Sequence, residues 1–277
     1  MLKEITIFSV LIIMGSTSFP GENRMEEIRL AIHNALSSSV NHYFSNFLGK
    51  SLPKIKEQGS MESMRDEPAT LNSSVLVKAL ETLKNMLPEP MPMVPFAVAE
   101  PTENNILVYF GILNSSFVNM TQFDAEASVN NTNSTTDITM KLHINSSSLG
   151  GLYELDVSNY NMHFYGNGNY SIITNSIDIF ITTNFQIFPN NSFLMSRFSL
   201  NMSIDSVQLL MPNFMGGDPS MQPFLEFIAQ TIPAEVPIVM DLIQDTLNLT
   251  VTEFVNSVLS DIFWDTFVQF IEYYAGY

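Results

Sequence analysis

Few side chains in this 277-residue chain have the types and spacing that chemistry needs. His143 and His163 fall in two neighbouring stretches that alternate apolar and polar residues, and Asp137, Glu154 and Asp156 lie near them in the sequence. Imidazoles beside carboxylates could act as an acid–base pair or as metal ligands. Ordinary outward-facing polar residues on two strands would give the same pattern. We expect this simpler arrangement, with no metal site and no catalytic residue.

Motifs of the common enzyme classes are absent from the sequence. It has no Gly-x-Ser-x-Gly elbow, no phosphate-binding loop of the NTPases and no His-Glu-x-x-His helix. The stretch GNGNYS at 166–171 lacks the third glycine of a dinucleotide-binding loop and joins strand to strand rather than strand to helix. We therefore expect no enzyme and no cofactor.

The net charge of −17 is placed unevenly along the chain. Residues 85–277 carry only Lys141 and Arg197 against 19 acidic residues. Such a surface repels nucleic-acid phosphates and anionic membranes, so we expect no nucleic-acid partner.

The N-terminus predicts export. Residues 1–18, MLKEITIFSVLIIMGSTS, combine a lysine, a short apolar run and small residues before a cleavage point, which is typical of a signal peptide. No later stretch approaches about 18 uninterrupted apolar residues, so we expect residues 19–277 to form a single soluble domain with no stable membrane insertion. Cysteine is absent, so stability must come from the core.

Ten Asn-x-Ser/Thr sequons agree with an extracellular location, although a face rich in Asn, Ser and Thr also makes sequons incidentally. The candidate glycosylation sites are Asn72, Asn114, Asn119, Asn130, Asn133, Asn145, Asn169, Asn190, Asn201 and Asn248.

The middle of the chain predicts a bent antiparallel sheet. Residues 150–188 alternate apolar and polar side chains with a period of two, which indicates strands with one buried face. The GNGN at 166–169 predicts a hairpin turn. Slips of the phase near 158–159 and 174–176 predict bulges or turns that curl the sheet. Further strands are expected at 106–118 and 127–147.

A glycosylated turn is expected at 130–136 and a pair of strands at 193–211. These stretches give at least five strands in sequential antiparallel connection, rather than alternating βαβ units.

Helices are predicted both before and after these strands in the sequence. In the N-terminal part, residues 23–48 form an amphipathic helix, 50–70 a mobile loop and 71–87 a short helix. The proline-rich residues 88–95 form an extended strap that cannot lie inside a sheet.

In the C-terminal part, residues 219–247 are helical but interrupted by Pro233 and Pro237. Residues 251–274 show the clearest amphipathic pattern in the chain. They have no Lys or Arg, so we expect them to pack on the sheet rather than insert into a membrane.

Three short motifs resemble those of one family: Gly-Leu-Tyr at 151–153, Gly-Asn-Gly-Asn-Tyr at 166–170 and Asn-Phe-Met-Gly-Gly-Asp at 213–218. Together with the order of elements, they resemble the takeout and juvenile-hormone-binding family, and also the related mite group-seven allergens of the tubular lipid-binding superfamily. Takeout-type members carry an N-terminal disulfide, so a chain without cysteine is more similar to the cysteine-free allergens. The resemblance implies an α+β fold, in which a highly curved antiparallel sheet wraps a long amphipathic helix, with C-terminal helices and a lipid tunnel.

On this resemblance, the expected function is a secreted carrier of a small apolar ligand such as a terpenoid or a fatty acid. The alternative is an extracellular recognition module that binds a protein or a microbial lipid at its surface and has no cavity. The ligand and the oligomeric state stay open. The residues expected to line the tunnel are Tyr153, Leu155, Val157, Met162, Phe164, Ile179, Ile181, Phe185, Phe198, Leu200, Phe224 and Phe227.

Overall fold

The computed structural model describes residues 68–93, 95–101, 107–158 and 163–276. The predicted signal peptide, the predicted helix at 23–48, most of the predicted loop at 50–70 and Met162 lie outside these ranges.

The described residues form one seven-stranded antiparallel sheet, in the order β1-β3-β5-β6-β7. Three long strands pair along their lengths, and β3 and β4 lie end to end along the outer edge of β5. The strands are β1 (Met91–Pro92), β2 (Phe96–Pro101), β3 (Leu107–Val118), β4 (Phe123–Asn131), β5 (Thr135–Ser158), β6 (His163–Ile187) and β7 (Phe193–Leu210).

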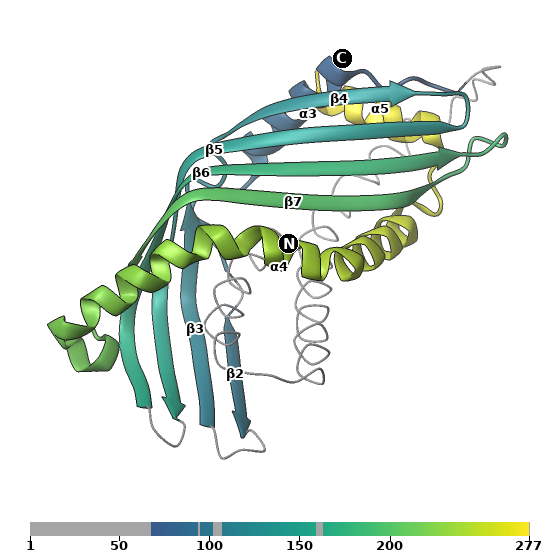
Figure 1. Cartoon of the computed structure of the whole chain (residues 1–277). Coiled ribbons are helices and arrows are strands. Elements are labelled where there is room, and N and C mark those ends of the chain that lie inside the picture. The colour runs from purple at the N-terminus through teal and green to yellow at the C-terminus, as the bar shows by residue number, and fades with distance from the viewer. Residues whose placement is uncertain (1–67, 94, 102–106, 159–162, 277) are drawn as a thin grey trace.

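The three long strands bend sharply together (Figure 1). In each of them buried or partly buried residues mostly recur at every second position, but at the bend the spacing between them is three. There Ile144 is followed by Ser147, Thr174 by Ile177, and Ile204 by the partly buried Val207. The skipped positions pair across the sheet, because Ser146 is opposite Asn175 and Asn175 is opposite Ser206. We call residues 145–146, 175–176 and 205–206 the crease.

The crease confirms the phase slip predicted near 174–176. Ser176 adopts φ +52°, and the side-chain amide of Asn175 donates to Ser206 Oγ at 3.1 Å. A residue in the left-handed region interrupts the pleat, so the buried face changes phase there.

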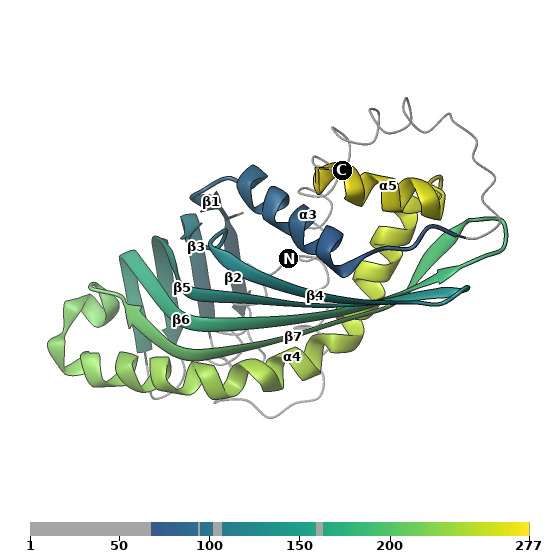
Figure 2. The same cartoon turned by 90° about the horizontal axis from the view of Figure 1, so that it is seen from above.

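Within the described ranges, three helices accompany the sheet. They are α3 (Ser73–Met86), α4 (Gln222–Leu259) and α5 (Trp264–Tyr274), and two short 3₁₀ turns precede α4, η1 (Phe214–Gly217) and η2 (Pro219–Met221). The 38-residue α4 runs along β7, while α3 and α5 lie side by side (Figures 1 and 2). This is the expected α+β fold of a highly curved sheet around a long helix, with α4 as the long helix.

Side-chain amides of α4 hold the edge of β7. Asn256 bonds both backbone groups of Met195, at 2.7 and 3.0 Å, and Asn248 Oδ1 accepts from the backbone N–H of Phe198 at 2.7 Å. Gln244 Nε2 donates to the backbone oxygen of Phe198 at 3.1 Å. These bonds satisfy edge groups that have no further strand beside them.

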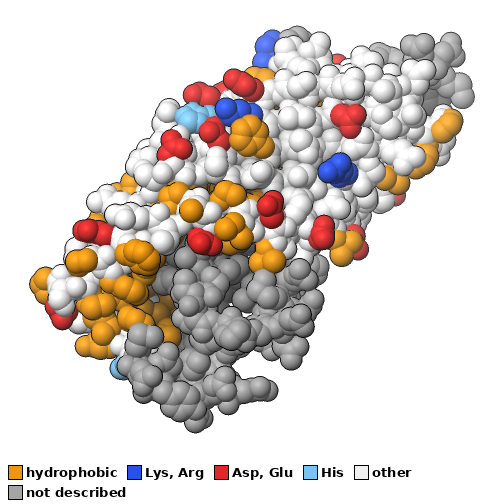
Figure 3. Space-filling model, viewed as in Figure 1, with side chains coloured by type: hydrophobic (Ala, Val, Ile, Leu, Met, Phe, Trp, Pro, Cys, Tyr) orange, Lys and Arg blue, Asp and Glu red, His pale blue; other side chains and the backbone are white. Residues whose placement is uncertain are grey.

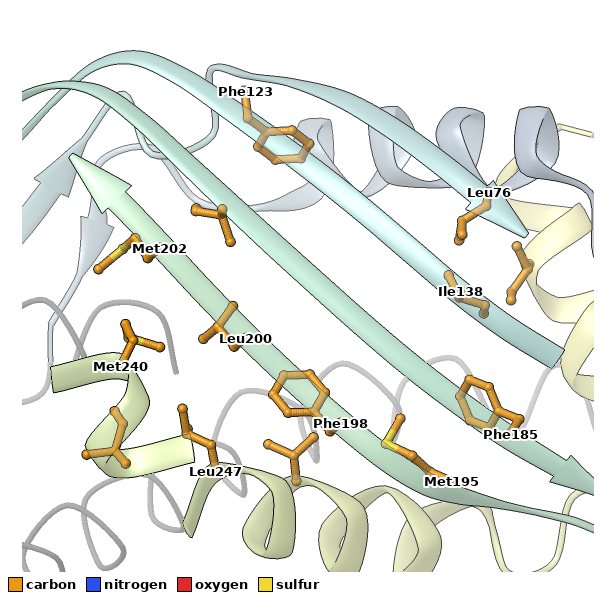
Figure 4. Close-up of a cluster of buried hydrophobic side chains, with 14 of the residues drawn as sticks. Leu76, Phe123, Ile138, Phe185, Met195, Phe198, Leu200, Met202, Met240 and Leu247 are labelled. Atoms are coloured by element: carbon orange, nitrogen blue, oxygen red, sulfur yellow. The ribbon is translucent and has the colours of Figure 1, made fainter. Parts of the chain in front are cut away.

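Two apolar cores form on opposite sides of the crease. The Trp264 core joins α3, α5, most of α4 and the strand segments on one side; Figure 4 shows Phe185, Leu200 and Met240 among its side chains. The Tyr153 core joins β3, the other halves of the long strands, η1 and the start of α4, with Tyr153, Tyr170, Phe214 and Leu225 at its centre.

The hairpin predicted at GNGN is wrong, since β6 continues through 166–169. The chain reverses instead between Ser158 and His163, which pair with each other. The glycines serve close packing: a Cβ on Gly166 would lie 2.8 Å from Asn213 O, and one on Gly168, at φ +131°, would lie 2.6 Å from Asn213 Nδ2. They let the 213–217 turn lie directly on the strand.

One further prediction at a strand boundary needs correction. Residues 193–210 form one strand rather than a pair, because the phase slip at Asp205–Ser206 is part of the crease and not a turn. The proline-rich strap agrees with its prediction, since among the described residues it joins the sheet as the two-residue edge strand β1, where the missing N–H of Pro92 costs least.

The predicted helix boundaries in the C-terminal part are also wrong. α4 continues through Pro233 and Pro237, and the break falls at 260–263, inside the stretch predicted as one helix. Each proline removes a single intrahelical bond. Buried neighbours such as Ile232, Val236 and Val239 hold the helix on the sheet through this segment, so it bends without ending.

Candidate ligand-binding interior

The predicted lining residues divide between the two cores. In the Trp264 core, Ile179, Phe185, Phe198 and Leu200 are buried and Ile181 is partly buried. In the Tyr153 core, Tyr153 is buried, and Leu155, Phe164 and Phe224 are partly buried against it. Val157 is half-buried near the end of β5. Phe227 is 61% exposed, so the prediction that it lines the interior is wrong.

Phe227 lies on the outward side of α4, because the helix buries Leu225 and Ala229 on its inward side instead. The amphipathic pattern of this stretch was too weak to tell the sides apart, since apolar residues occur on both.

Three phenylalanines stack in the Tyr153 core. The rings of Phe164 and Phe224 are 5.3 Å apart and nearly parallel, at 5°, and Phe214 stacks on both at about 6 Å. Phe214 comes from η1, which the closely packed glycines of β6 hold against the sheet. Its place in the interior was missed, although the Asn-Phe-Met-Gly-Gly-Asp motif marked the turn that carries it.

Tyr153 brings an unpaired polar group into this apolar interior. Its side chain is 1% exposed, and its hydroxyl has no hydrogen-bond partner among the described residues. Burial raises the pKa of Tyr153, so the group is a neutral O–H donor. An unsatisfied buried group of this kind costs about 1–3 kcal/mol, which a bound oxygen atom would recover.

The neighbouring Tyr170 differs, because it has a partner. Its hydroxyl donates to Ser115 Oγ at 2.9 Å, and burial raises the pKa of Tyr170 to about 12. Its ring meets that of Tyr153 edge to face, with centroids 6.5 Å apart. Of this pair of buried tyrosines, only Tyr153 has a hydroxyl without a partner among the described residues.

A small pocket of about 150 Å³ opens where β7, η1, η2 and α4 meet. Its lining is mixed: apolar Leu210, Met211, Phe214, Met221 and Leu225 occur together with polar or small residues that include Gly217, Asp218 and Gln222. Ligand pockets are usually about 300–1,000 Å³, so this one has room for a single side chain rather than for a lipid.

The two histidines lie apart in the structure. His143 Nδ1 is 3.0 Å from Asp178 Oδ1 on β6, whereas His163 Nε2 is 2.9 Å from Asp156 Oδ1, fifteen residues further along the β5–β6 ladder. The pKa of His143 is raised by its bonds to Asp178 and Asn145. Asp178 was missed because it is far from His143 in sequence.

The other predicted carboxylates are also engaged separately. Asp137 accepts from Asn184 Nδ2 at 2.6 Å, and Glu154 accepts from the hydroxyl of Tyr109 at 2.9 Å. Within the described ranges, no group of three or more His, Cys, Asp and Glu side chains is placed to hold a metal ion. Nor does any helix there have the length and apolar character to span a membrane.

The ten sequons differ in accessibility. Nine of their asparagines are exposed, namely Asn72, Asn114, Asn119, Asn130, Asn133, Asn145, Asn169, Asn190 and Asn201. Asn248 is half-buried and bonds the edge of β7, and the hydroxyl residue of its sequon, Thr250, is buried. Glycosylation stays a prediction, and Asn248 is the site least suited to it.

Eighteen chains of solved structures match this one, among them the following two. Takeout 1 of Epiphyas postvittana is 10% identical, with a TM-score of 0.44, over 72% of this chain and 97% of that one. A lipopolysaccharide binding protein is 10% identical, with a TM-score of 0.32, over 66% of this chain and 40% of that one. No curated protein matches the chain.

The comparison with family models gives a clear result. The model of the haemolymph juvenile hormone binding protein family matches residues 70–269, which include the whole of α3, the sheet and α4. This span exceeds half of the chain and confirms the resemblance that the three motifs indicated. The chain therefore belongs to the haemolymph juvenile hormone binding protein family.

Proposed function

We propose that the protein is a secreted, N-glycosylated carrier that binds a small hydrophobic ligand, of terpenoid or fatty-acid type, in its interior. The observation that carries this proposal is the family match over residues 70–269, since the family is named for binding a hormone in haemolymph. The carrier acts by reversible sequestration and needs no chemistry. This agrees with a set of histidines and carboxylates that are paired separately on the sheet.

The Tyr153 core is the better candidate for the ligand. Its Phe164 and Phe224 are only partly buried, so they can contact a further apolar group. Burying about 400 Å² of ligand surface would contribute about 10 kcal/mol before the loss of ligand freedom, which costs several kcal/mol. The balance is compatible with sub-micromolar binding.

The hydroxyl of Tyr153 would then orient the ligand. A carrier that leaves the buried Tyr153 hydroxyl unpaired favours a ligand with an oxygen atom at the matching position, because that oxygen removes the cost of the unpaired group. A hydrocarbon of the same length would gain the apolar burial alone.

Competition against a fluorescent fatty acid tests the proposal. We expect saturable binding at one ligand per chain, and tighter binding for an oxygenated ligand than for the matching hydrocarbon. Tyr153→Phe should remove most of this preference, by about tenfold, while leaving hydrocarbon binding unchanged. Tyr170→Phe is the matched control, since its hydroxyl is already bonded to Ser115.

If fatty acids of several chain lengths show no saturable binding, the proposed carrier function would be contradicted. This result would favour the alternative, a recognition module that uses its outer surface. If Tyr153→Phe binds saturably and still prefers the oxygenated ligand, the carrier function would be supported and the proposed role of the Tyr153 hydroxyl would be contradicted.

A further inference from the structure

The outward side of α4 exposes large apolar side chains at a regular spacing. Phe227, Ile238 and Leu249 are 61%, 61% and 54% exposed, and each is eleven residues from the next. Eleven residues are close to three helical turns, so the three side chains lie on one side of the helix. Exposed Ala234 lies in the same row. We call these four residues the α4 stripe.

Acidic groups accompany the stripe. Asp241 and Asp245 are exposed between Ile238 and Leu249, and Glu226 and Glu253 are exposed near the two ends. Figure 3 shows hydrophobic and acidic side chains next to each other over this helix. Residues 198–277 contain ten acidic residues and no Lys or Arg, so the charge is of one sign throughout this part of the chain.

The negative charge around the α4 stripe indicates which kind of partner could bind there. A second copy of the chain would bring two acidic helices together, and like charges in contact destabilise an interface. An anionic membrane is repelled for the same reason. A partner with apolar residues flanked by Lys or Arg matches both the stripe and its carboxylates.

We propose that the α4 stripe binds a partner protein through a basic amphipathic segment, with apolar side chains on the stripe and Lys or Arg opposite Asp241 and Asp245. This surface lies on the outside of the helix, so the inference does not depend on an internal ligand.

The test uses the full mature chain and a synthetic 18-residue helical peptide with leucines on one face and lysines on the other. We expect calorimetry to detect binding that weakens as salt is raised. The double variant Phe227→Ser/Ile238→Ser should weaken it at least tenfold, and Asp241→Asn/Asp245→Asn about threefold. Phe263→Ser, at a residue 57% exposed in the loop after α4, and Asp124→Asn/Asp205→Asn should leave it unchanged.

Several results would overturn the proposal. They are no binding, equal binding of a scrambled peptide of the same composition, or equal losses in the stripe and control variants. A dimer in light scattering that Phe227→Ser/Ile238→Ser converts to monomer would assign the stripe to self-association. Binding to phosphatidylcholine vesicles that this variant loses would assign it to a lipid surface. Circular dichroism confirms that each variant is folded.

Discussion

The two sides of the crease show different ways of filling an interior. Around Trp264, which is fully buried, rings from β6, β7 and α5 pack within 6 Å of one another, and the indole N–H donates to the backbone oxygen of Ala69 at 2.7 Å. Around Tyr153, a hydroxyl is unpaired and two phenylalanines are only partly buried. Unpaired buried oxygens also occur on the first side, at Thr183 and Asn191, so the second differs in having its unpaired group on a tyrosine beside the three stacked phenylalanines.

The largest effect is expected on the Trp264 side. Trp264→Ala should lower the free energy of unfolding by about 3–5 kcal/mol, because it opens a cavity among Phe185, Phe193 and Phe267 and removes the bond to Ala69. Urea unfolding followed by circular dichroism measures it. The neighbouring Phe263 is 57% exposed, and Phe263→Ala should cost less than about 0.5 kcal/mol. Similar losses in the two variants would contradict a tightly packed Trp264 core.

A smaller effect is expected where α4 meets β7. Asn256→Ala should cost about 1–3 kcal/mol, because the backbone N–H and C=O of Met195 both lose their partner. Gln230→Ala, at an exposed position of the same helix, is the control and should change stability by less than about 0.5 kcal/mol. Chemical unfolding of the two variants makes the comparison. If Asn256→Ala is as stable as the control, the amides do not hold the sheet edge.

The two buried tyrosines test the Tyr153 side of this comparison. Tyr153→Phe should leave the ligand-free protein equally stable or raise its stability by up to about 1 kcal/mol, because it removes an unpaired polar group. Tyr170→Phe should cost about 1 kcal/mol, because it breaks the bond to Ser115. Thermal unfolding in the absence of ligand measures both. A clear loss in Tyr153→Phe would mean that its hydroxyl is already satisfied.

The smallest effect concerns the outer face of the sheet. Asp178→Asn should lower the pKa of His143 toward its ordinary value, since the bond to Asp178 is the main cause of the raised pKa. A raised pKa in the folded state means that the pair stabilises the fold below the unfolded pKa of histidine and that this contribution is lost as the pH rises through the folded value. NMR titration of the imidazole measures it. An unchanged pKa would show that Asp178 does not hold the imidazole.

Local patterns predicted much of this fold. The alternating residues gave β3 within one residue at its start, and the apolar spacing gave α3, whose capping by Asn72 was not predicted. The phase slip near Ser176 located the crease, because a change of buried face is visible in the alternation itself. In each case the deciding interactions lie within a few residues of one another.

Contacts between distant residues were not predictable in this way. The glycines of GNGN have the composition of a hairpin turn, but Asn213 and Phe214, about 45 residues later, use them for close packing. The amides of Asn248 and Asn256 look like ordinary polar residues of a helix until β7 lies beside them. The outward place of Phe227 likewise depends on which side of α4 the sheet covers.

Labelling with a photoreactive fatty acid tests the central claim most directly. After irradiation and digestion, mass spectrometry should find saturable labels, competed by unlabelled fatty acid, on peptides of the Tyr153 core that contain Phe164 or Phe224. Labels confined to exposed positions such as the α4 stripe, or labels that competitor does not reduce, would contradict an internal binding site.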